Sequence, residues 1–133
     1  MILHLTQEDF HQTLENNPMV VVDFWAKWCM PCKMMQPVLK QLDETFGKSI
    51  VIGKADVDEL PQLADQYQIH SIPALVIFAK GEVVSTIIGV RPYTQIVDEV
   101  QKQLDAQTAQ QTAAEKEDRP AEAEEPILMS DEK

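Results

Sequence analysis

The residues best able to do chemistry are the two cysteines of the chain, Cys29 and Cys32, which are separated by Met30 and Pro31. Two thiols three positions apart can close a small disulfide ring, and a thiolate in such a pair is the nucleophile of thiol–disulfide exchange. The same spacing occurs in half of a zinc site, and two thiols can also be merely structural. A closed zinc site usually has four ligands, and none of the three histidines stands at a finger-like spacing. The pair therefore predicts redox chemistry.

The residues around the pair predict a strand that turns into a helix. Residues 19–25 are almost continuously apolar and β-branched, which is typical of a strand covered on both faces. Apolar residues from Met34 to Phe46 follow helical spacing. A helix that starts beside Cys29 supplies unpaired N–H groups and a partial positive charge, and both favour a thiolate. Pro31 suits the first helical turn because it lacks an N–H that would go unused there. This context strengthens the redox interpretation.

The periodicity of the whole chain predicts an α/β fold in which strands alternate with helices. Further strands are expected at residues 2–5, 50–52, 74–78 and 82–88. Strand–helix–strand links favour parallel neighbours, and the tight turn at Lys80-Gly81 forces one antiparallel pair. The expected result is a mixed central sheet flanked by helices on both faces. Reaction sites in such sheets gather at the carboxyl ends of the strands, which is where the cysteines follow their strand.

Charge and composition limit the classes of function. The chain has 22 acidic and 11 basic residues and a net charge of −11. Phosphate backbones and anionic lipids repel such a chain, so we expect neither nucleic acid nor a membrane as a partner. No apolar run is long enough for a spanning helix, and the first residues lack the basic flank and apolar stretch of a signal peptide. We therefore expect a cytoplasmic protein.

A change in composition divides the chain. We expect residues 1–106 to form one domain and residues 107–133 to form an acidic, disordered tail, with the last helix extending to about residue 114. The tail holds 8 acidic and 3 basic side chains, and residues 107–126 contain no aromatic or β-branched aliphatic side chain. Such a segment cannot bury enough apolar area to offset the entropy of ordering it. The apolar triplet Ile127-Leu128-Met129 is a candidate docking segment within this tail.

The chain resembles the thioredoxin family over residues 2–106. The resemblance is carried by Val21 to Lys33, by Pro37, by Ile72-Pro73-Ala74-Leu75, by the turn Lys80-Gly81-Glu82 and by Gly89. It implies a thioredoxin fold and a protein-disulfide reductase that takes part in electron transport and cell redox homeostasis. The family usually has Gly-Pro between the cysteines, where this chain has Met30-Pro31.

The resemblance also implies catalytic roles. Cys29 would be the nucleophile and Cys32 the resolving thiol. Asp23 would relay a proton to Cys32, and Lys54 would modulate it. A carboxylate within a buried strand should have a raised pKa because burial disfavours the charged form. Asp23 as a structural polar residue, and Lys54 as a solvated lysine at a strand end, remain alternatives.

A substrate site follows from the same resemblance. The peptide bond between Ile72 and Pro73 should be cis and should lie opposite the dithiol, where a substrate backbone can pair with the residue before the proline. An apolar groove for an extended polypeptide would be formed by Trp28, Met30, Pro31, Ile72, Gly89 and Val90.

The resemblance further implies partners. We expect a monomer with no metal and no bound cofactor, which receives electrons from an NADPH-dependent flavoprotein thioredoxin reductase and passes them to disulfide-containing client proteins. Two alternatives stay open. One is a protein-binding module in which the redox pair is incidental, and the other is a disulfide isomerase or oxidant tuned by Met30.

Overall fold

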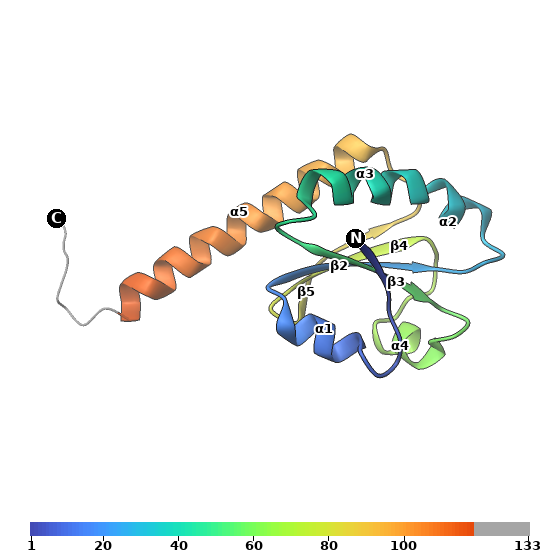
Figure 1. Cartoon of the computed structure of the whole chain (residues 1–133), viewed down its shortest axis with the longest axis horizontal. Coiled ribbons are helices and arrows are strands. Elements are labelled where there is room, and N and C mark those ends of the chain that lie inside the picture. Colours follow the sequence, from blue (N-terminus) through green and yellow to red (C-terminus); the bar gives the residue numbers. More distant parts are fainter. Residues whose placement is uncertain (119–133) are drawn as a thin grey trace. The chain divides into compact units, whose positions relative to one another are not determined.

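The computed structural model describes residues 1–118 and the side chains of residues 1–108. In this part of the chain, five strands form one sheet in the order β1-β3-β2-β4-β5 (Figure 1). The strands are β1 (Ile2–His4), β2 (Met19–Trp25), β3 (Val51–Asp56), β4 (Ala74–Ala79) and β5 (Glu82–Ile88). The helices are α1 (Phe10–Asn16), α2 (Met30–Met34), α3 (Gln36–Phe46), α4 (Pro61–Gln66) and α5 (Tyr93–Asp118).

The sheet is mixed, as the sequence predicts. Strands β1 and β2 run parallel to β3, and β4 runs antiparallel to both β2 and β5. The β4–β5 pair is the antiparallel hairpin expected at Lys80-Gly81, whereas the antiparallel pairing of β4 with β2 was not predicted. It places the start of β4 beside the end of β2, with Ala74 opposite Phe24. The segment before β4 therefore reaches the end of the sheet where β2 leads into the cysteines.

Strand β2 lies at the centre of the sheet and is buried on both faces, which explains its continuous apolar sequence. Val20, Val22 and Phe24 pack in a core cluster with residues of α1 and α4. Since successive side chains alternate between the two faces, Asp23 points to the other face. In Figure 1, α1 and α4 lie on one side of the sheet and α2 and α3 on the other. Asp23 is therefore directed toward the layer that contains the cysteine helix.

The helix after the cysteines is interrupted. We predicted helical spacing without a break from Met34 to Phe46, and this was wrong at Met35, which lies between α2 and α3. The cause is Pro37 at the start of α3. A proline within a helix has no N–H to donate, and its ring clashes with the carbonyl four residues earlier. The break leaves α2 as a short helix whose first residues belong to the cysteine segment.

Helix α5 crosses the boundary between two compact units, of which the first comprises residues 1–101 and the second begins at Lys102. In the first unit, Ile96 and Val100 of α5 are fully buried. The helix continues to Asp118, beyond the predicted end near residue 114. The rest of the predicted disordered tail, including Ile127-Leu128-Met129, lies outside the described residues. The domain end at residue 106 stays a prediction.

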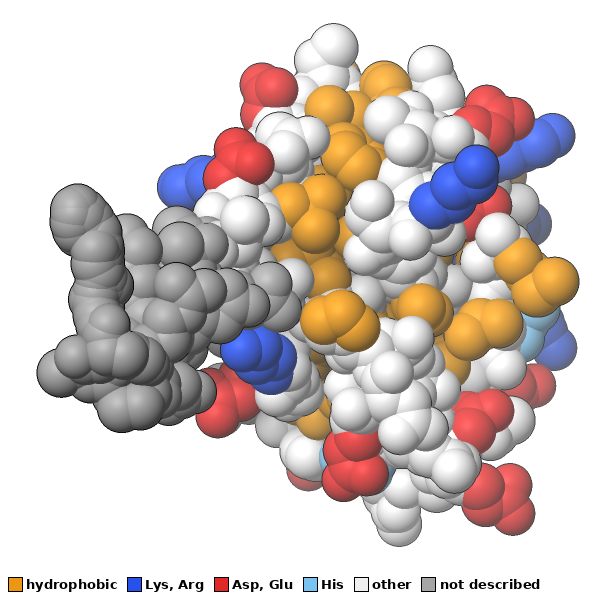
Figure 2. Space-filling view, turned by 60° about the vertical axis from the view of Figure 1, so that its left-hand side comes forward, with side chains coloured by type: hydrophobic (Ala, Val, Ile, Leu, Met, Phe, Trp, Pro, Cys, Tyr) orange, Lys and Arg blue, Asp and Glu red, His pale blue; other side chains and the backbone are white. Residues whose placement is uncertain are grey.

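The surface mixes polar and apolar groups. Figure 2 shows a face on which hydrophobic side chains form a broken vertical band and acidic side chains are spread around the edge. Among the exposed apolar residues are Val83, Val84 and Ile88 of the edge strand β5. In the described part of the chain, no helix combines the length and the apolar content needed to cross a bilayer.

Ending the chain after Ala114 should leave its thermal stability almost unchanged. Among the described side chains, every buried core residue lies at or before Val100, so the truncation removes none of them. Changes that spare the core usually alter stability by less than about 0.5 kcal/mol, so the melting temperature should shift by less than about 2 °C. Circular dichroism of the full and shortened chains during heating measures this shift. A fall of more than about 5 °C would show that the removed residues stabilise the domain.

Candidate active site at the dithiol

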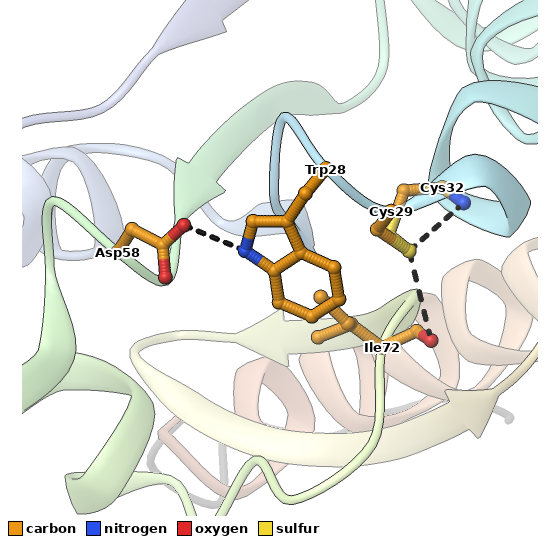
Figure 3. Close-up of a disulfide and its surroundings, with 5 residues drawn as sticks. All are labelled: Trp28, Cys29, Cys32, Asp58 and Ile72. Atoms are coloured by element: carbon orange, nitrogen blue, oxygen red, sulfur yellow. Dashed lines mark hydrogen bonds between the residues drawn. A yellow bond between two sulfur atoms is a disulfide. The ribbon is translucent and has the colours of Figure 1, made fainter.

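Cys29 and Cys32 form a disulfide where β2 leads into α2 (Figure 3). Their Cα atoms are 5.3 Å apart, which is an ordinary separation for a disulfide. Cys29 is the N-cap residue of α2, and Pro31 occupies the first turn, as predicted. A thiol at the start of a helix is expected to be more exposed than one a turn inside it, but Cys29 and Cys32 are only 4% and 1% exposed. Trp25, Val57 and Ile72 pack against the cysteines, and they account for the low exposure of Cys29.

A backbone donor is directed at the first sulfur. The N–H of Cys32 lies in the first turn of α2 and donates to Cys29 Sγ over 3.2 Å (Figure 3). Hydrogen bonds to a charged form favour that form, so this donor stabilises a thiolate on Cys29 whenever the disulfide is open. The helix has no acidic residue in its first turn to oppose that charge. The geometry thus distinguishes Cys29 from Cys32 chemically although both are buried.

The loop before β4 lies against the cysteines. The Ile72–Pro73 peptide bond is cis, which confirms the expectation drawn from the sequence. Ile72 O lies 4.0 Å from Cys29 Sγ, and the Ile72 side chain packs against the cysteine cluster (Figure 3). Gly89, which has φ +88°, donates its N–H to Pro73 O over 2.8 Å. Ile72, Pro73 and Gly89 therefore lie at the end of the sheet where the cysteines are found.

Trp28 stands beside the disulfide and is anchored by a residue that sequence reasoning missed. Its indole is 70% exposed, and its Nε1 donates to Asp58 Oδ2 over 2.8 Å (Figure 3). Asp58 is itself held, because its N–H donates to Asp56 Oδ1 over 2.9 Å. The available signal was the acidic run Asp56-Val57-Asp58-Glu59 directly after a strand, at the edge of the sheet where reaction sites gather.

Other predicted groove residues are accessible to a partner. Met30 is 65% exposed and Val90 is 39% exposed. Met34, one helical turn after Met30, is also exposed and was not predicted to take part. Ile72 packs against the cysteine cluster, and Trp28 directly precedes Cys29 in the chain (Figure 3). Exposed apolar side chains thus occur on α2 and in the segment after β5.

Asp23 is completely buried, and neither of its carboxylate oxygens has a hydrogen-bond partner among the described residues. Burial raises the pKa of Asp23 from 3.8 to about 7, although the positive charge of Lys54 lowers it. Lys54 is the residue opposite Asp23 in the register of β2 with β3, and its Nζ also lies 4.1 Å from the centre of the Trp25 ring. Asp23 therefore gains or loses a proton near neutral pH, which is what a proton relay requires.

The site contains no evident place for a metal. Within the described part of the chain, no three His, Cys, Asp or Glu side chains are placed to hold a metal ion together.

Comparison with known proteins shows what this arrangement resembles. The family model described as Thioredoxin matches residues 1–102. A thioredoxin of Listeria monocytogenes is 41% identical over 102 residues, which cover 77% of this chain and 98% of the relative. A solved structure of a mutant thioredoxin from Halobacterium salinarum has a TM-score of 0.71 and 33% identity, and the match covers 76% of this chain and 88% of that chain.

A second solved structure concerns the thiol-resolving mechanism of a yeast mitochondrial 1-Cys peroxiredoxin through the glutathione and thioredoxin systems. Its TM-score is also 0.71, with 32% identity over 76% of this chain and 94% of that chain.

Proposed function

Because the chain belongs to the thioredoxin family of protein-disulfide reductases, we propose that Cys29 attacks client disulfides and that Cys32 resolves the product. In the first step, the Cys29 thiolate forms a mixed disulfide with one client sulfur and releases the other as a thiolate. In the second step, the Cys32 thiolate attacks Cys29 Sγ, which closes the Cys29–Cys32 disulfide and releases the second client sulfur. The client gains two electrons, and the pair loses two.

The observation that carries this order is the contact between the Cys32 N–H and Cys29 Sγ. The sulfur that receives a backbone hydrogen bond is the better stabilised thiolate, and the thiolate is the attacking species. Cys32 lies one turn farther into the helix, within reach of the same sulfur. We therefore assign it the attack on the mixed disulfide rather than on the client.

Asp23 is proposed to assist the second step. Cys32 must lose its proton before it can attack, and a carboxyl group with a pKa near 7 can accept that proton at neutral pH. Asp23 points to the face of the sheet that carries α2, so the transfer would run directly or through a water molecule. Lys54, opposite Asp23 on β3, would tune the carboxyl group through its positive charge.

The client is proposed to bind in the apolar groove around the sulfurs. Trp28, Met30, Ile72 and Val90 would contact its side chains, with Pro31 and Gly89 lining the same groove. An extended client backbone would pair with the residue before Pro73, because Ile72 O lies 4.0 Å from Cys29 Sγ. Trp28, held by Asp58, would give this groove a rigid aromatic wall.

Each cycle leaves the pair oxidised, so two electrons must be returned to it. We assign this step to an NADPH-dependent flavoprotein thioredoxin reductase, working in the cytoplasm, where dithiols are kept reduced. Disulfide-containing proteins are the clients. Peroxidases of the kind named with the yeast structure are candidates among them.

Insulin reduction in the presence of dithiothreitol tests the proposal. The wild-type chain should accelerate precipitation of the insulin B chain, and Cys29→Ser should lower the rate to that of dithiothreitol alone. Equal acceleration by both proteins would contradict the assignment of Cys29. A wild-type chain that binds partners but does not accelerate the reaction would instead indicate a binding module.

A further inference from the structure

A pocket that is separate from the client groove collects basic side chains. It has a volume of about 700 Å³, within the usual range for sites that bind small molecules. His4 enters it from β1, Lys54 from β3, Lys33 from α2 and Lys40 from α3. Among the described residues that line it, none is acidic, and neither Trp28 nor Ile72 is included. We call this site the basic pocket.

Such a gathering of positive charge is unexpected in a chain with twice as many acidic as basic residues. Three lysine ammonium groups around one pocket repel one another, and this repulsion is relieved when an anion binds between them. Within the described residues, the recorded ion pairs involve none of these lysines. The ammonium group of Lys54 also lies 4.1 Å from the centre of the Trp25 ring, so the charges most available to a ligand are those of Lys33 and Lys40.

Acidic groups near these lysines in the sequence do not pair with them. Asp56, two positions after Lys54, accepts the Asp58 N–H, and among the described residues Glu44, four positions after Lys40 on α3, forms no ion pair. Asp43 follows Lys40 by three positions on α3, but both its carboxylate oxygens accept hydrogen bonds from the Met1 amino group, over 2.7 and 2.9 Å. Glu59, beyond the end of β3, lies 3.8 Å from Lys27. The carboxyl group that does act on Lys54 is the buried Asp23, and its raised pKa leaves it only partly ionised at neutral pH. The chain thus supplies little countercharge to the pocket.

We propose that the basic pocket binds a small multivalent anion of the phosphate class. Lysine ammonium groups bind phosphate as point charges, and three of them from three different elements can surround one ligand. The apolar side chains of Ile2 and Leu39 form part of the wall, so less water competes for the bound group. Lys33 directly follows Cys32 in the chain. The anion would therefore lie beside the helix that carries the redox pair while the client groove stays open.

Titration of the full chain with pyrophosphate tests the proposal. We expect saturable binding, with amide resonances shifting at residues 2–4, 33–40 and 54, in a buffer held at constant ionic strength with sodium chloride. Lys40→Gln should weaken binding roughly fivefold, the factor that corresponds to about 1 kcal/mol for one charge pair at 4 Å in water. Lys48→Gln is the matched control, because Lys48 follows α3 and does not line the pocket, and it should leave the affinity unchanged.

Three results would overturn the proposal. The first is a shift that rises linearly with pyrophosphate and never saturates. The second is an equal loss of affinity in Lys40→Gln and Lys48→Gln, which would indicate diffuse attraction to surface lysines. The third is a set of shifts centred on other residues. None of these measurements depends on disulfide reduction, so the outcome is independent of the catalytic assignment above.

Discussion

Cys32→Ser should trap client proteins as stable mixed disulfides on Cys29. The substitution removes the thiol that closes the cycle, while the N–H of residue 32 remains to stabilise the Cys29 thiolate. The first step then proceeds, and the second cannot. Non-reducing electrophoresis of a lysate passed over the immobilised variant should show client bands that dithiothreitol releases. Mass spectrometry should locate the mixed disulfide at Cys29.

Cys29→Ser is the matched control, and it should trap nothing. The two cysteines differ little in exposure, at 4% and 1%, so general accessibility does not predict a difference between the two variants. If only one variant traps clients, the difference would therefore be caused by the hydrogen bond to Cys29 Sγ and by the positions of the two cysteines in α2. Equal trapping by the two variants would contradict the order of attack.

Asp23→Asn should stabilise the chain above about pH 7 and should lose this advantage below about pH 4. The folded carboxyl group keeps its proton up to a pKa of about 7, whereas the unfolded one loses it near 3.8. Proton binding therefore favours the folded wild type at low pH, and that contribution is lost as the pH rises from about 4 to about 7. The difference amounts to roughly 4 kcal/mol. Asparagine does not ionise, so the variant escapes this loss.

Urea unfolding of both proteins at about pH 4, 6 and 8 measures this effect. The informative quantity is the change in the stability difference with pH, since any cost of burying the asparagine amide is the same at every pH. Asp56→Asn provides a control, because Asp56 is also buried but its Oδ1 already accepts a hydrogen bond from Asp58. This variant controls for the effect of placing an amide at a buried aspartate position.

The same Asp23→Asn variant should resolve mixed disulfides more slowly. General-base assistance typically contributes a factor of 10² to 10⁴, so we expect a loss on the order of 100-fold at pH 7. Stopped-flow measurement of Cys32 attack on a preformed mixed disulfide isolates this step. A large loss of stability together with an unchanged rate would show that Asp23 has only a structural role.

The sequence contains enough information for the fold class and for most of the site. The side chains of β2 are buried on both faces of the sheet, and those of α3 are buried on one face of the helix. This burial requires apolar residues at regular spacing, and the spacing is visible in the sequence. The antiparallel pairing of β4 with β2 was not predictable, because periodicity identifies a strand but not the end of the sheet at which it begins. The break at Met35 was predictable from Pro37, and the helical spacing outweighed that signal in our prediction.

The features of the site that were not predicted depend on contacts between residues distant in the sequence. Asp58 lies 30 positions from Trp28, and the acidic residues after β3 suggest a site at that edge of the sheet but not a contact with Trp28. The basic pocket was also not predictable. In the sequence, each of its basic residues resembles an ordinary solvated side chain, and only the fold brings them to one pocket: His4, Lys33, Lys40 and Lys54. The low exposure of Cys29 likewise depends on Ile72, which reaches it through the fold of the loop before β4.

The reduction potential of the Cys29–Cys32 couple tests most directly whether this pair donates electrons to clients. Met30 adds exposed apolar surface beside Cys29 but has no donor that could further stabilise the thiolate, so it should leave the couple reducing. Equilibration of the chain with a series of dithiothreitol redox buffers gives the potential. We expect about −270 mV, the value known for thioredoxin. A value near −120 mV, typical of a strong disulfide oxidant, would contradict the reductase assignment.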